Sequence, residues 1–287
     1  MTLAIVVNNI KITKKSTIWK VILLVLLFIG LYYQIIFYMV KDWYNDSNYS
    51  HGFLIPFISA YIIWTNREKI FTIRIKPDNL GLLVLFFGLS VYILGIIGAE
   101  FFTMRFSMIP VILGIVYYLC GREMVKSILL PVGFLVCMIP IPAIVFNIVA
   151  FPLKLLAANI ATNIIQFVNI PVIRDGNIIH LADMSLEVAD ACSGIRSLMS
   201  MIALGVAYAY IFQKSMLKRT ILVLCIVPIT IITNVGRVTG TGILSHYVGQ
   251  AAAQGFFHEF AGIVVFLVAF AMFISVATIL RIWKTES

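Results

Sequence analysis

Charged residues are scarce in this chain of 287 residues: Asp, Glu, Lys and Arg make up 11%, against roughly 25% in soluble domains. Hydrophobic residues make up 62%, and the mean hydropathy is +1.05. A run of about 20 apolar residues crosses a bilayer as a helix, because the backbone in lipid must satisfy its hydrogen bonds internally. The low charge therefore excludes a soluble globular protein and predicts an all-α, polytopic membrane protein.

Other features are missing as well. The sequence has no internal repeat, no low-complexity tract and no polar stretch long enough to fold alone, so we expect one membrane domain over residues 1–287. No cleavable signal peptide is expected, because the apolar run at 19–40 is longer than the apolar part of a signal peptide and lacks a small-residue cleavage site. The histidines and acids match no metal-ligand spacing, so no metal or other cofactor is expected.

The apolar runs that are present fit about eight membrane spans. We place them at residues 19–40, 52–66, 79–99, 101–120, 125–141, 193–212, 217–245 and 256–281. Segment 142–191, between the fifth and sixth spans, has a different pattern. The apolar residues of its first part are interrupted by Lys154, Asn159, Asn163 and Gln166, which is typical of an amphipathic helix lying in the membrane interface. Turn residues follow at 174–177, and residues 178–188 are predicted to form a short hairpin.

The basic residues set the orientation of these spans. With the N-terminus in the cytoplasm, the outer loops hold four basic residues, which are Lys41, Arg105, Lys154 and Arg174. The inner loops hold fifteen: Lys11, Lys14, Lys15, Lys20, Arg67, Lys69, Arg74, Lys76, Arg122, Lys126, Lys214, Lys218, Arg219, Arg281 and Lys284. Because inner loops of membrane proteins are enriched in Lys and Arg, we expect both termini in the cytoplasm and segment 142–191 outside. The net charge of +9 then reflects topology and not nucleic-acid binding.

This topology brings three chemically capable residues to the outer face. Cys192 begins the sixth span there, and His258 opens the eighth. Arg237 lies 20 residues beyond the inner start of the seventh span at Leu217, roughly 30 Å along a helix. A thiol, a guanidinium and an imidazole at one bilayer face are suited to thiol-based acyl transfer.

Cys192 is the candidate nucleophile. It lies beside Ser193 and Gly194 at a helix N-terminus, which lowers the pKa of a thiol and favours the thiolate. Ordinary packing is the alternative, since free cysteine is often buried. That interpretation suits Cys120, Cys137 and Cys225, which lie within apolar spans without polar neighbours.

Arg237 and His258 are the candidate partners of the thiol. Arg237 lies in a polar, Gly- and Thr-rich helix segment, and an arginine there can donate hydrogen bonds to an oxyanion. His258 has the intrinsic pKa of a general acid or base. The alternatives are an arginine that extends to the interface, an interfacial histidine without a task, and His246 of the neighbouring outer loop in place of His258.

Five further residues are candidates for substrate binding or support. Asn234 lies one turn before Arg237 and can brace it or the substrate backbone. Arg196 lies one turn after Cys192 and either pairs with Glu187 or Asp190 or assists the chemistry. His51, in an outer loop, is expected at the entrance of the site.

Several short motifs in this order resemble the exosortase/archaeosortase family of multispanning membrane transpeptidases, over most of the chain. They are Asn48-Tyr49-Ser50-His51-Gly52, Met138-Ile139-Pro140-Ile141-Pro142, Arg174-Asp175-Gly176, Glu187, Ala191-Cys192-Ser193-Gly194-Ile195-Arg196, Asn234-Val235-Gly236-Arg237, and His258 with Gly262. The family's cysteine, arginine and histidine fall on Cys192, Arg237 and His258. Because archaeal relatives commonly carry arginine at the third position, His258 favours the bacterial exosortase branch.

The resemblance implies a cysteine transpeptidase of the cytoplasmic (inner) membrane whose site faces the periplasm or outside. Its substrates would be exported, membrane-anchored proteins with a C-terminal sorting signal: a short motif, commonly Pro-Glu-Pro, then a transmembrane helix and a basic tail. An unknown acceptor nucleophile would resolve the Cys192 acyl-enzyme. The alternatives are a non-catalytic assembly or transport component of an exopolysaccharide or protein export system, and a metal-dependent membrane protease.

Overall fold

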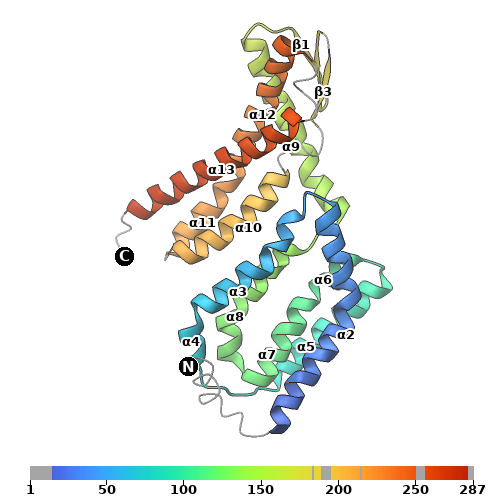
Figure 1. Cartoon of the computed structure of the whole chain (residues 1–287), viewed down its shortest axis with the longest axis vertical. Coiled ribbons are helices and arrows are strands. Elements are labelled where there is room, and N and C mark those ends of the chain that lie inside the picture. Colours follow the sequence, from blue (N-terminus) through green and yellow to red (C-terminus); the bar gives the residue numbers. More distant parts are fainter. Residues whose placement is uncertain (1–14, 183, 189–194, 214, 250–255, 284–287) are drawn as a thin grey trace. The chain divides into compact units, whose positions relative to one another are not determined.

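The computed structural model describes residues 15–182, 184–188, 195–213, 215–249 and 256–283. Within these ranges the chain is mostly helical, with one small sheet, as the composition predicts. It divides into two compact units, Met1–Ile141 and Pro142–Ser287 (Figure 1). The division falls where the sequence changes character, at the Pro-containing stretch before the 142–191 segment.

The first unit is built from helices. They are α2 (Lys15–Asn45), η1 (Ser50–Phe53), α3 (Ile55–Thr65), α4 (Arg67–Thr72), α5 (Leu80–Ile97), α6 (Phe101–Phe106), α7 (Met108–Cys120), α8 (Arg122–Phe134) and η2 (Leu135–Met138). Three stretches are long and apolar enough to cross a membrane, namely Val21–Asn45, Leu80–Ile97 and Phe101–Cys120. A shorter apolar stretch, Ser50–Thr65, matches the expected second span. The expected fifth span, 125–141, is the 13-residue α8 followed by η2, with Pro131 inside α8.

Glycines let α5 and α7 pack at close range. Gly81, Gly88 and Gly95 recur every seven residues along α5, so they lie on one helix face. A Cβ added at Gly88 would lie 2.8 Å from the backbone nitrogen of Val111 in α7. Small residues at such contacts are the usual means by which membrane helices approach each other, because lipid provides no hydrophobic drive between them.

Replacing Gly88 by alanine is therefore expected to destabilise the protein by about 1–3 kcal/mol, because the new methyl group overlaps the α7 backbone. The matched control is Gly30→Ala in α2, where an added Cβ has nothing within 4 Å. Thermal unfolding of the purified protein in detergent measures both variants. An equal midpoint for Gly88→Ala and Gly30→Ala would contradict the close packing of α5 on α7.

The described residues of the second unit form five helices and the small sheet. The helices are α9 (Ala143–Phe167), α10 (Ile195–Phe212), α11 (Met216–Leu224), α12 (Ile226–Val248) and α13 (Phe256–Ile282). The strands are β1 (Val172–Asp175), β2 (Ile178–Leu181) and β3 (Ser185–Glu187), antiparallel in the order β1-β2-β3. Gly176, with φ +58°, lies in the two-residue turn that joins Asp175 to Ile178. The predicted turn is confirmed, as is the predicted hairpin, in which Ile178 of β2 pairs with Glu187 of β3.

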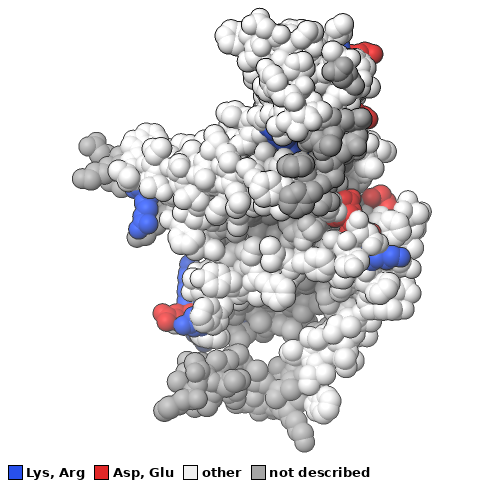
Figure 2. Space-filling model, turned by 45° about the horizontal axis from the view of Figure 1, so that its top comes forward, with Lys and Arg blue, Asp and Glu red and all other residues white. Residues whose placement is uncertain are grey.

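Three spanning stretches belong to this unit: Ala143–Phe167, Met216–Val248 and Phe260–Ile282. The apolar stretch Ser197–Phe212 is shorter than these. Among the described residues, six helical stretches therefore meet the length and composition of a membrane span, which supports a multi-pass membrane protein and does not confirm the expected count of eight. On the face of the molecule that Figure 2 shows, charged side chains are few among the described residues.

The interfacial helix expected in segment 142–191 is not confirmed, because α9 packs along α12. A Cβ added at Gly242 would lie 2.7 Å from Cδ1 of Ile165. Towards the starts of the two helices, Leu153 of α9 shares a pocket with Val227 of α12. The two helices thus run in the same direction. Ala157, Ala158 and Ala161 form the contact face of α9 and are almost fully buried.

Candidate active site

Helices α10, α11 and α13 share one end of the second unit, which carries basic residues. Lys218 Nζ donates to the carbonyl of Trp283 at 2.6 Å, and Gln213 Nε2 donates to the carbonyl of Ala277 at 3.2 Å. From this end, α10 and α13 run antiparallel to the α11–α12 stretch. The start of α10, the start of α13 and the second half of α12 therefore lie together at the opposite end.

Arg237 lies in that second half of α12, next to α13. A Cβ added at Gly262 of α13 would lie 3.7 Å from Nη2 and 3.9 Å from Cζ of Arg237. Glycine at position 262 thus leaves room for the guanidinium. Arg237 itself is half-buried, between the buried residues Val235 and Val238.

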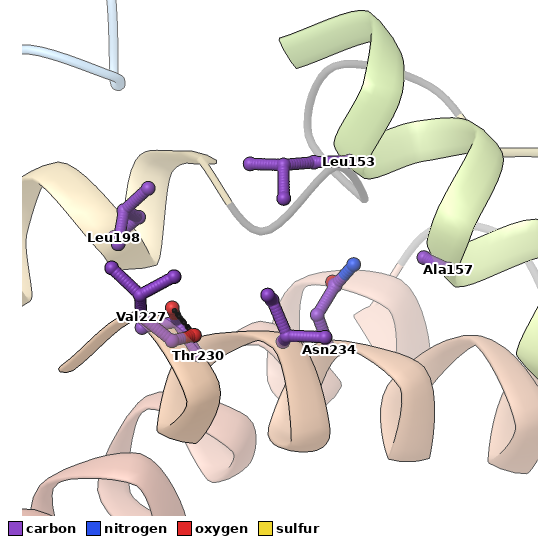
Figure 3. A pocket seen from close by; sticks show the side chains of 7 residues that line it. Leu153, Ala157, Leu198, Val227, Thr230 and Asn234 are labelled. Atoms are coloured by element: carbon purple, nitrogen blue, oxygen red, sulfur yellow. Dashed lines mark hydrogen bonds between the residues drawn. The ribbon is translucent and has the colours of Figure 1, made fainter. Parts of the chain in front are cut away.

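Asn234 lies one turn before Arg237 and is 4% exposed. It helps to line a small pocket among three helices (Figure 3). The labelled lining residues are Leu153 and Ala157 of α9, Leu198 of α10, and Val227, Thr230 and Asn234 of α12. Asn234 thus places a polar side chain in an otherwise mostly apolar pocket, one helical turn before Arg237.

The chain on both sides of residues 189–194 packs against this part of α12. Val188 is fully buried in a cluster that includes Val235 and Val238. Leu198 is buried against the pocket that Asn234 lines. Described residues that precede and follow this stretch in the sequence thus pack on α12, Val188 with Val235 and Val238, and Leu198 at the pocket that Asn234 lines.

The predicted site residues differ in how far the structure describes them. Cys192 and Asp190 lie outside the described residues. Arg196 is in the first turn of α10 and His258 in the first turn of α13, but their side chains are not among those described. Glu187 ends β3 with its side chain exposed.

His246, the alternative to His258, lies in the last turn of α12, against the ring of Tyr247 at 5.1 Å between centroids. It follows Arg237 by nine residues, which is about 13 Å along the helix. Cys120, Cys137 and Cys225 are free and half-buried. Among the described side chains, His, Cys, Asp and Glu form no group of three that could hold a metal ion.

A comparison with known protein families identifies the family of this chain. The model of the transmembrane exosortase family matches residues 43–275. The chain belongs to the transmembrane exosortase family. The matched residues include every candidate site residue, from His51 to His258. No curated protein and no solved structure matches the chain.

His51 of this exosortase has a clear structural partner in the first unit. Its Nε2 donates to the carbonyl of Cys137 at 3.2 Å. Trp43 Nε1 donates to the carbonyl of Met138 at 2.7 Å, and Tyr49 Oη donates to the carbonyl of Ile141 at 3.2 Å. The three side chains hold the irregular backbone that ends the first unit. Gly52 belongs to the same arrangement, because an added Cβ would collide with Trp43.

Sequence reasoning missed the position of Lys154, which it assigned to an outer loop. The structure places Lys154 in the middle of α9, half-buried on the face formed by Ala150, Ala157 and Ala158. These alanines lie four residues before and three and four after it, a spacing that could have revealed the face. Since an ionisable residue within a membrane helix usually marks a functional site, Lys154 joins the candidate residues of this exosortase.

Proposed function

We propose that this exosortase is a membrane-embedded cysteine transpeptidase that cleaves the C-terminal sorting signal of exported, membrane-anchored proteins. One observation carries the proposal. The described residues on both sides of residues 189–194 pack on α12, because Val188 shares a buried cluster with Val235 and Val238, and Leu198 lines a pocket with Asn234. Described residues that precede and follow Cys192 in the sequence thus pack on the helix that carries the proposed oxyanion donor.

The position of His258 supports its role as the third member. His258 precedes Gly262 by four residues on α13, so the two positions share a helix face. Gly262 lies against Arg237. In the same proposal Asn234 braces Arg237 or the substrate backbone, and Arg196, Glu187 and Asp190 support the segment around Cys192.

The proposed reaction has two acyl-transfer steps. The Cys192 thiolate attacks the scissile carbonyl carbon and forms a C–S bond, while Arg237 donates hydrogen bonds to the resulting oxyanion. Collapse of this intermediate breaks the C–N bond, and His258 gives a proton to the departing amine. An acceptor nucleophile then attacks the thioester and gives its proton to His258, and the C–S bond breaks to release the Cys192 thiolate.

The substrate and the enzyme share a bilayer in this proposal, which orients the substrate and raises its effective concentration. The site faces outward from the cytoplasmic membrane, and the basic tail of the substrate lies in the cytoplasm. The enrichment of basic residues in the inner loops, which includes Lys218 and Arg219 at the inner end of the second unit, supports this orientation.

Co-expression with a tagged substrate that carries a Pro-Glu-Pro-type C-terminal signal tests the proposal. Wild-type enzyme is expected to shorten the substrate, and a membrane-permeant thiol-alkylating reagent is expected to block the shortening. A chelator is expected to have no effect. Shortening that the chelator stops and the thiol reagent does not would replace the proposal with a metalloprotease. A full-length substrate at normal enzyme levels would favour an assembly or transport role.

Replacing His51 by alanine is expected to destabilise the enzyme by about 1–3 kcal/mol, because it leaves the Cys137 carbonyl without its donor. His51→Gln, which retains an N–H donor, is expected to recover part of this loss. Thermal unfolding measures the stability of both variants, and substrate processing is compared at equal amounts of folded enzyme. Normal stability with strongly reduced processing would instead assign His51 to the entrance of the site, as the sequence suggested.

A further inference from the structure

We propose that the pocket beside Asn234 is a subsite for one apolar side chain of the substrate, from the first residues after the cleaved bond. This inference rests on the proposed function, because it takes the scissile carbonyl to lie at Arg237. It adds a determinant of substrate choice that is separate from the chemical step.

The position of the pocket along α12 indicates which residues of the substrate can reach it. Asn234, Thr230 and Val227 precede Arg237 by three, seven and ten residues, so they lie about 4.5, 10 and 15 Å closer to the inner end of the helix. If the C-terminus of the substrate lies in the cytoplasm, the residues that follow the scissile bond must run past the pocket towards the inner face of the membrane. An extended chain covers about 3.3 Å per residue. The side chains that can reach the pocket are therefore those of the first four or so residues after the bond.

The lining of the pocket defines the chemistry of that side chain. Leu153, Ala157, Leu198 and Val227 present apolar groups from three helices. The hydroxyl of Thr230 donates within α12, to the carbonyls of Ile226 and Val227 at 2.9 Å. Asn234 adds an amide to the lining (Figure 3). Of the lining residues of α12 it is the nearest in sequence to Arg237, where a substrate backbone would pass. The pocket is small, so it discriminates apolar side chains by size.

Size-exchange variants of the pocket test this inference. Ala157→Leu fills the pocket and Leu153→Ala enlarges it. Leu156→Ala is the matched control, because Leu156 lies on α9 and is 41% exposed on the surface of the unit. Each enzyme is co-expressed with a substrate series in which each of the four residues after the cleaved bond is Ala, Leu or Phe. The measured quantity is the ratio of processed to full-length substrate at equal enzyme levels in the membrane.

At one or two of these positions, Ala157→Leu is expected to reduce processing of the Leu substrate about 10- to 100-fold more than that of the Ala substrate. Leu153→Ala is expected to improve processing of the Phe substrate about 10-fold, and it carries the test alone if Ala157→Leu does not accumulate. Equal effects on all side chains would overturn the inference. So would processing that responds to lipid chain length and not to side-chain size, because a lipid would then occupy the pocket. Processing that survives Cys192→Ala would refute the proposed function itself.

Discussion

Replacing Cys192 by alanine is expected to reduce substrate processing roughly 10⁴-fold or more, because removal of a covalent nucleophile disables the whole catalytic unit. A serine at this position is expected to be almost as poor, since a hydroxyl needs a stronger base than a thiol. Immunoblotting of a tagged substrate, at equal enzyme levels in the membrane, measures the effect.

Cys225→Ala provides the matched control for this loss. Cys225 is a free, half-buried cysteine in the same unit, between α11 and α12. Cys225 has no chemical role in the proposed mechanism, so processing by Cys225→Ala is expected to equal that of wild type. If Cys192→Ala processed the substrate as well as Cys225→Ala does, the thiol mechanism would be wrong.

Loss of the Arg237 guanidinium is expected to produce the second largest effect. Arg237→Gln should reduce processing about 10²- to 10³-fold, the usual effect of removing one oxyanion donor. The measurement is the initial rate of substrate shortening, with the amount of folded enzyme checked by thermal unfolding. Processing within a few-fold of wild type would show that Arg237 serves only the structure.

The contact between Gly262 and Arg237 allows an independent test of this role, in which the Arg237 guanidinium is displaced but not removed. Gly262→Ala is expected to have little effect, because the added Cβ would lie in ordinary contact at 3.7 Å from Nη2. Gly262→Leu places further atoms where the guanidinium lies and is expected to reduce processing about 10²-fold, as displacements near 1 Å can do. The control is Gly240→Leu in α12, where an added Cβ meets nothing within 4 Å. Equal rates for the two leucine variants would contradict the role of Arg237.

The fold class and the local turns could be predicted from the sequence, because both depend on short-range features. Low charge and long apolar runs predict membrane helices, and Gly176 within a polar turn predicts the hairpin that follows. The course of α9 could not be predicted in the same way. Its Lys154 and Asn163 suggest an interfacial helix, whereas Ala157, Ala158 and Ala161 gain their meaning only from α12, more than 60 residues later.

The sequence could predict at which membrane face the candidate site residues lie, but not which side chains they contact. Span lengths predict that Arg237 and the start of the last helix reach the same face, and the structure places Gly262 beside Arg237. The roles of Cys192, Arg237 and His258 stay predictions. His51 shows the limit of the sequence, because its partner, the Cys137 carbonyl, lies 86 residues away. A backbone acceptor so far away in the sequence cannot be predicted from the pattern of side chains.

The most direct test of the central claim is to trap the acyl-enzyme and identify the atom that carries it. Tryptic cleavage after Arg174 and Arg196 releases a peptide in which Cys192 is the single cysteine. After brief reaction with substrate and acid quenching, mass spectrometry is expected to find the substrate's acyl group on this peptide, and hydroxylamine is expected to remove it. Turnover of the substrate with an unmodified Cys192 peptide, or with the acyl group on another residue, would contradict the account.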